Sequence, residues 1–133
     1  YLDCPGYSPF DDMADLIRAA WDEDTAHGSE WTKDTPSRGQ AAATALLVND
    51  MTAMPVIRGR ARRPDGTLAN HYWNQGLDLT ADQFPEGTTF TATPGLQGRA
   101  ARDYLTAFPP VFKRYAILAE RFHEARCRLQ IAS

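Results

Sequence analysis

Two polar side chains on a predicted hairpin have the types and spacing that acid–base chemistry needs. His71 lies in an alternating segment, and Asp78 follows the turn dipeptide Gln75-Gly76. If that dipeptide forms a two-residue turn, Asn74 pairs with Leu77, and His71 becomes a diagonal neighbour of Asp78 on one face. A carboxylate there orients an imidazole, so we predict His71 as the acid–base residue and Asp78 as its partner. The alternative is a structural hydrogen bond between strands.

The start of a predicted helix near Gln40 supplies a second element of such a site. Backbone N–H groups and partial positive charge at a helix N-terminus stabilise an oxyanion, here beside Gln40 and Ala41. The Gln40 side chain adds an amide donor in this interpretation. Ser37 and Gln40 also fit a capping box, and the two roles are compatible. Residues predicted to bind or wall in a substrate, with core packing as the alternative for the aromatic ones, are Trp31, Ser37, Tyr72, Trp73 and Asn74.

Helices and a short sheet must position these residues. Apolar side chains recur at helical spacing in four segments: Phe10–Asp24, Arg38–Met51, Gly98–Phe108 and Pro110–Gln130. The second segment begins with small residues, so it is predicted to pack closely at the centre. The segment 25–36 mixes Gly, Ser, Asp, Thr and Pro and is predicted as a loop. The last helix is expected to turn a wet face to solvent through Arg114, Arg121, Arg126 and Arg128.

Alternating residues between the helical segments predict an antiparallel sheet. Three strands are expected in a meander, Val56–Arg62, Thr67–Asn74 and Leu77–Thr80, with a turn at Pro64-Asp65-Gly66. The predicted fold class is therefore α+β, in a single domain over residues 1–133. The arginines 58, 60, 62 and 63 are expected on a solvated face, with contact to an acidic ligand or partner as the alternative.

Composition excludes several classes of partner. The formal net charge is −3, so the chain has no electrostatic footprint for nucleic acid. The longest mostly apolar run, Ala41–Val48, is far shorter than the roughly 20 residues that cross a bilayer. The first five residues carry no basic or apolar export signal, and Cys4 and Cys127 follow no disulfide spacing, so a reducing cytoplasm is expected. No metal is predicted, because His123 and Cys127 lack a third ligand.

The three polar motifs together resemble a known family. The run Pro36-Ser37-Arg38-Gly39-Gln40-Ala41-Ala42-Ala43-Thr44-Ala45-Leu46 is similar to the YunG-family signature Pro-Ser-x-Gly-Gln-Cys-Ala-x-Thr-Ala-Leu, and His71-Tyr72-Trp73-Asn74 and Asp78-Leu79-Thr80 extend the match. The likeness runs from about Leu16 to Phe84. YunG-like proteins look like thiol enzymes of papain-like architecture, so the resemblance implies a Cys-His-Asp site with Gln beside the Cys. In this chain Ala41 stands in the place of that Cys.

Without a thiolate at position 41 there is no covalent acyl-enzyme there, which leaves three functional hypotheses. In the first, His71 and Asp78 deprotonate a nucleophile that the substrate supplies. Ring closure of an amine, of the aziridine type, on a carrier-bound intermediate of bacterial natural-product biosynthesis is the chemical analogy. In the second, the protein is a thiol amidase, peptidase or acyltransferase with its Cys replaced by Ala41. In the third, it is a catalytically dead binding module or partner subunit. No cofactor is expected in any of them, and a small-molecule or carrier-bound substrate is expected in the first.

Overall fold

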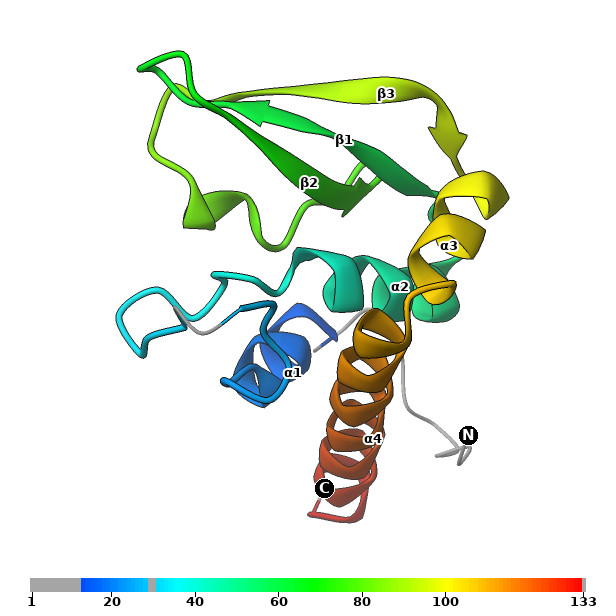
Figure 1. Cartoon of the computed structure of the whole chain (residues 1–133). Coiled ribbons are helices and arrows are strands. Elements are labelled where there is room, and N and C mark those ends of the chain that lie inside the picture. Colours follow the sequence, from blue (N-terminus) through cyan, green and yellow to red (C-terminus); the bar gives the residue numbers. More distant parts are fainter. Residues whose placement is uncertain (1–12, 29–30, 133) are drawn as a thin grey trace.

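The computed structural model describes residues 13–28 and 31–132, with side chains up to residue 128. Within these residues the helices are α1 (Met13–Ala20), α2 (Ala41–Thr52), α3 (Arg99–Thr106) and α4 (Pro109–Ala132). The strands are β1 (Val56–Arg62), β2 (Leu68–Asn74) and β3 (Thr89–Gln97), and a 3₁₀ turn, η1, covers Ala81–Gln83. Figure 1 shows the sheet on one side of α2 and the helices α1 and α4 on the other. The predicted α+β class is confirmed.

The β1–β2 hairpin forms as the alternation predicted. Val56 pairs with Asn74 at one end and Arg62 with Leu68 at the other. The turn is stabilised by Asp65, whose carboxylate accepts hydrogen bonds from the backbone N–H of Thr67 at 2.9 Å and from its hydroxyl at 2.7 Å. Such a side-chain turn fixes the register of the hairpin. The register decides which side chains of β2 reach the site.

The predicted third strand, Leu77–Thr80, is not formed. Leu77 makes only an isolated bridge to Asn74, after which the Asp78 carboxylate accepts a hydrogen bond from the backbone N–H of Thr80 at 3.1 Å. This local bond turns the chain away from the sheet, because it takes a donor that a ladder would need. The third strand is β3 instead, which pairs antiparallel with β1 and gives the order β2-β1-β3.

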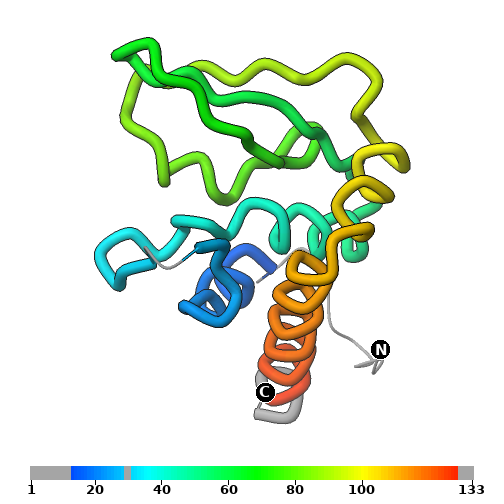
Figure 2. The backbone as a smooth tube through the Cα atoms, in the orientation of Figure 1, coloured from blue at the N-terminus to red at the C-terminus, as the bar shows by residue number. Residues whose placement is uncertain are grey.

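The small-residue helix α2 lies at the centre of the molecule, as predicted. Its residues 43 to 48 are buried, and the tube in Figure 2 passes between the sheet and the layer of α1 and α4. Trp21, just after α1, donates from its indole N–H to the Thr44 hydroxyl at 2.9 Å. The helix begins at Ala41 rather than Arg38. This boundary places the first turn of α2 directly against the predicted site.

The two C-terminal helices confirm the predicted segments, but not the predicted wet face of α4. Arg121 donates to the Ala20 carbonyl at 3.2 Å and pairs with Asp22 at 2.8 Å, so it joins α4 to the end of α1. Arg126 is buried, whereas Arg128 is exposed as expected. The periodicity of the sequence predicted the apolar face of α4. It gave no sign that the segment after α1 would contact the polar face of this helix.

The expected start of the first helix, residues 10–12, and Cys4 lie outside the described residues. Cys127 is disulfide-bonded, which differs from the expectation of reduced cysteines. The cysteines therefore no longer support the prediction of a reducing compartment. Spacing along the chain says little about such a bond, because residues distant in sequence can meet in the fold. Among the described residues, no helix is both long and apolar enough to cross a membrane.

Candidate active site

His71 and Asp78 meet as the hairpin register predicted. The His71 Nε2 and the Asp78 Oδ2 lie 2.7 Å apart, with the imidazole fully buried and the carboxylate mostly so. The other carboxylate oxygen, Oδ1, accepts hydrogen bonds from Thr80, at 3.1 Å from the backbone N–H and 3.3 Å from the hydroxyl. Asp78 is thus held from behind while it accepts the bond from His71, so both the position and the tautomer of the ring are fixed.

Aromatic rings hold the imidazole on its remaining sides. Trp73 stacks on it with ring centroids 5.4 Å apart, and Phe84 and Phe90 pack at 5.0 and 5.2 Å. Gly59, opposite His71 on β1, makes room for this packing, because a Cβ there would lie 2.5 Å from the Trp73 ring. These contacts restrict rotation of the imidazole, and they exclude water from the faces that they cover.

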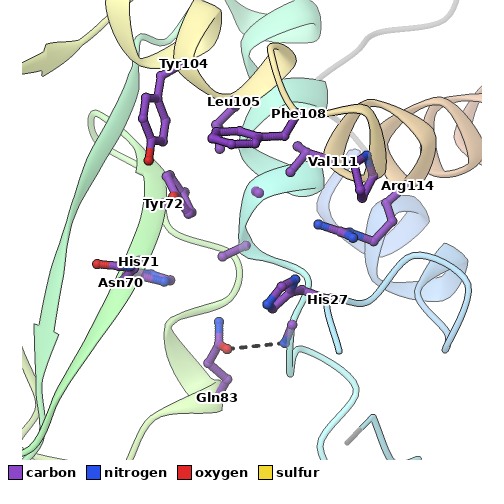
Figure 3. Close-up of a pocket in the computed structure, with 14 residues that line it drawn as sticks. His27, Asn70, His71, Tyr72, Gln83, Tyr104, Leu105, Phe108, Val111 and Arg114 are labelled. Carbon is purple, nitrogen blue, oxygen red and sulfur yellow. Dashed lines mark hydrogen bonds between the residues drawn. The ribbon is translucent and has the colours of Figure 1, made fainter. Parts of the chain in front are cut away.

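The second ring nitrogen of His71 has no partner, and His71 lines a pocket. Nδ1 is buried and has no hydrogen-bond partner, and the residue lines a cavity of about 480 Å³. Because a carboxylate accepts from Nε2–H, the neutral ring carries a lone pair on Nδ1, which can accept a proton. Figure 3 shows His71 on the strand side of this pocket. General base catalysis requires such an acceptor within reach of a bound substrate.

The first turn of α2 forms one wall of the same pocket. Ala41 and Ala42 line the pocket, and the first hydrogen bond of the helix runs from Thr44 N–H to the Gln40 carbonyl at 3.0 Å. The amides that precede Thr44 in the helix therefore have no partner within it. They bring N–H donors and the positive end of the helix dipole to the cavity that His71 also lines.

Gly39, just before this helix, joins three segments at the floor of the pocket. Its φ is +76°, and a Cβ there would lie 2.7 Å from the His27 carbonyl oxygen, so only glycine fits. The Gly39 carbonyl accepts from the His27 N–H at 2.9 Å, and the Gln83 side chain accepts from the Gly39 N–H at 3.4 Å (Figure 3). His27 and Gln83 consequently both line the pocket.

The end of α3 and the start of α4, here called the α3–α4 corner, line the pocket with apolar side chains and with the cationic side chain of Arg114. Tyr104, Leu105, Phe108 and Val111 line this side, and Figure 3 shows the guanidinium of Arg114 reaching toward the cavity from α4. Burial lowers the pKa of Arg114 from its usual value. Among the described residues Arg114 has no ion pair or hydrogen bond. This corrects its predicted place on a wet face.

Two of the predicted residues at the helix start do not reach the pocket. Gln40 is fully buried, donates from Nε2 to the Asp22 carbonyl at 3.0 Å and does not line the cavity, so it is not placed as an oxyanion donor. Ser37 is buried, with its carbonyl accepting the Gln40 N–H, and α2 has no side-chain cap. The predicted capping box is therefore wrong, because the chain makes an extra turn before the helix begins.

Three of the predicted wall residues do not line this pocket. Asn74 donates to the Ala45 carbonyl at 3.0 Å and so ties β2 to α2. Trp31 donates to the Pro36 carbonyl at 2.9 Å within its own loop, and Trp73 packs against His71 without lining the pocket. Tyr72 does line it. Strand alternation and a turn predicted the His71–Asp78 pair, but side-chain directions at loops depend on distant segments.

The sequence interpretation missed most of the residues that line the pocket, among them His27, Gln83, Arg114 and Phe108. Arg114 follows Val111 by three positions on α4, a spacing that puts both on one helix face, so its proximity to an apolar wall could be inferred once Val111 was placed. The other three lie in or beside loops, where periodicity gives no signal.

Comparison with known proteins identifies the chain at family level. A family model described as YunG protein matches residues 9–126, well over half of the chain. No curated protein and no solved structure matches it. The motif likeness around Gln40, His71 and Asp78 lies inside the matched range. The chain belongs to the YunG family.

Proposed function

We propose that this protein is an acid–base enzyme in which His71, oriented by Asp78, deprotonates a nucleophile carried by the substrate itself. The observation that supports this most strongly is that His71 lines the pocket while its buried Nδ1 lacks a hydrogen-bond partner. An unsatisfied buried acceptor costs free energy, and it is retained where a ligand supplies the missing donor. The donor in this proposal is the N–H or O–H of the substrate.

The reaction class that suits such a base is intramolecular ring closure of an amine. The proton of the amine passes to Nδ1 of His71, the nitrogen lone pair attacks a neighbouring carbon, and the leaving group departs with the bonding electron pair. Asp78 stabilises the imidazolium that forms, and the amides at the start of α2 stabilise negative charge on the leaving group. Aziridine formation, on a free or carrier-bound amine, gives the smallest ring of this class. The proposal includes the case in which this protein is one subunit of a heteromeric enzyme.

A second candidate is a thiol hydrolase of papain-like arrangement in which Ala41 replaces the nucleophilic Cys. It is favoured by one observation: Ala41, at the first turn of a helix, lines the same pocket as the base. In this case Ala41→Cys restores a nucleophile, and a p-nitrophenyl ester gives a burst of one p-nitrophenol per active site. Absence of the burst in the folded variant removes this candidate.

The leading proposal is tested with an amine that carries its own leaving group. The probe is 1-bromo-3-phenylpropan-2-amine, which closes to an aziridine and releases bromide. Since positioned general bases contribute roughly 10²–10⁴-fold, we expect the protein to accelerate bromide release by at least about 100-fold and His71→Gln to abolish the acceleration. Asp78→Asn is expected to lose most of it.

The matched control is His123→Gln, which changes a buried histidine of α4 that does not line the pocket. It should keep the wild-type rate. Undiminished bromide release by a folded His71→Gln variant removes the acid–base proposal and makes the binding-module hypothesis the leading one.

A further inference from the structure

The guanidinium of Arg114 lacks the partner that the comparable arginines have. Arg102 pairs with Asp50 at 2.9 Å, and Arg121 pairs with Asp22 at 2.8 Å. Arg114 is half-buried, burial lowers its pKa, and no charge among the described residues offsets this. Removing a cation from water without a counter-charge is unfavourable. The missing counter-charge is therefore expected to come from a ligand.

The surroundings of Arg114 are those of an anion site rather than of a solvated surface. His27 and the first turn of α2 line the same pocket, so a second potential donor and the positive end of a helix dipole accompany the guanidinium. Figure 3 shows Arg114 and His27 directed toward the same part of the cavity, across from His71. His71, whose buried Nδ1 has no hydrogen-bond partner, lines the same cavity and is an independent sign of a missing ligand.

We infer that Arg114, assisted by His27, binds an anionic oxygen group of the substrate, a carboxylate or a phosphate ester. A guanidinium presents paired N–H donors that match two oxygens of either group. The apolar body of the same molecule packs on Tyr104, Leu105 and Phe108, as in small-molecule sites with few polar groups and mostly apolar walls. In this respect the inference deepens the proposed function, because it places the reacting N–H or O–H of that molecule at His71.

The positions of Arg114 and His71 on opposite sides of the pocket determine how a substrate would lie in it. The anion lies at Arg114 on the α4 side and the reacting group at His71 on the β2 side (Figure 3). The start of α2 lines the same pocket through Ala41 and Ala42, so its amides are available to the bound molecule. Binding energy from the anionic end positions the reacting end, which raises the rate of the chemical step.

Binding measurements test the inference without any turnover. The probes are 3-phenylpropanoate, 2-phenylethyl phosphate and the neutral 3-phenylpropanamide, titrated by calorimetry into the full chain. We expect either anion to bind at least about tenfold more tightly than the amide, and Arg114→Gln to remove that preference. Arg114→Lys should keep part of it, since the charge remains and the paired donors are lost. The tighter of the two anions identifies the source of the charge.

Arg128→Gln is the matched control, because Arg128 lies on the same helix, is exposed and does not line the pocket. It should bind like the wild type. Equal affinity for amide and carboxylate, or equal losses in Arg114→Gln and Arg128→Gln with both variants folded, overturns the inference. His71→Gln separates the two proposals: retained anion preference with lost bromide release supports both, and retained preference with retained release removes only the acid–base role.

Discussion

Two carboxylates, Asp50 and Asp78, each face a basic side chain, and the two pairs are built differently. Arg102 reaches Asp50 at 2.9 Å and also donates to the Leu46 carbonyl at 3.2 Å and to the Asn49 side chain at 2.9 Å. Asp50 further accepts a hydrogen bond from the Tyr115 hydroxyl. The second pair, His71 and Asp78, leaves the Nδ1 of the ring without a partner.

This difference is the one expected between a structural pair and a pair with the chemical role proposed above. The Asp50–Arg102 pair joins α2 to α3 and, through Tyr115, to α4, and its bonds spread over several partners. In the His71–Asp78 pair, one ring nitrogen is held by the carboxylate and the other has no partner, which the proposed function assigns to a ligand. A short distance between opposite charges is common to both, so the distance alone says little about function. The features that point to a function are the unpartnered Nδ1 of His71 and the cavity that His71 lines.

The largest expected effect lies in the structural pair. Asp50→Ala leaves the mostly buried Arg102 without its carboxylate, so we expect the free energy of unfolding to fall by about 3–4 kcal/mol. Urea denaturation measures the change. Asp103→Ala is the control, because the Arg99–Asp103 pair is exposed and should contribute less than about 0.5 kcal/mol. Similar losses in the two variants contradict the structural role.

A pH effect of similar size is expected next to the structural pair, at His123. Burial, together with the charge of Arg126, lowers the pKa of His123 to about 4. The unfolded chain binds this proton near pH 6.5 and the folded chain only near pH 4. The contribution of His123 to the free energy of unfolding is therefore fully present above pH 6.5, and it falls by up to about 3 kcal/mol as the pH drops to 4.

Denaturation midpoints of the wild type and His123→Gln across pH 4 to 7 isolate this contribution. The slope of wild-type stability between pH 6.5 and 4 should be the steeper one, because the variant has lost one titrating group. Glu120, Glu124 and Arg102 line a shallow pocket with His123, and they are common to both proteins. Parallel curves refute the assigned role of His123.

The free nitrogen of His71 is expected to activate a thiol placed opposite it. In Ala41→Cys, Nδ1 accepts the thiol proton, which lowers the thiol pKa and raises the thiolate fraction near pH 6. Iodoacetamide should then label position 41 roughly 100-fold faster than it labels free cysteine. Peptide mapping follows the label. In the double variant with His71→Gln the rate should fall to that of free cysteine, and an unchanged rate shows that the imidazole does not face position 41.

The smallest expected effect concerns the packing that holds His71. In Gly59→Ala the new Cβ meets the Thr91 carbonyl oxygen at 2.3 Å and the Trp73 ring at 2.5 Å. Overpacking of this kind costs about 1–3 kcal/mol, so we expect roughly 2 kcal/mol and an altered tryptophan fluorescence. Gly66→Ala is the control, since its Cβ meets open space and only its φ of +88° is unfavourable. Unchanged fluorescence in Gly59→Ala contradicts the tight Trp73–His71 packing.

The two pairs also show what the sequence can predict. The His71–Asp78 contact spans seven residues around a recognisable turn, so local rules were sufficient for it. The short strand expected after that turn was wrong because the Asp78 side chain satisfies the Thr80 N–H locally. The roles of Gln40 and Arg114 depend on segments more distant in the chain, the Asp22 carbonyl and the α3–α4 corner. Such contacts have no signature in periodicity or turn type.

The short sequence separation of His71 and Asp78 has a consequence for the order of folding. Closing a loop of a few residues is entropically inexpensive, whereas the pocket brings together residues 27, 41, 71, 83 and 114. Contacts of high sequence separation form late and limit the folding rate. We therefore expect the hairpin to orient the imidazole early, and the pocket to be complete only when the last helix docks.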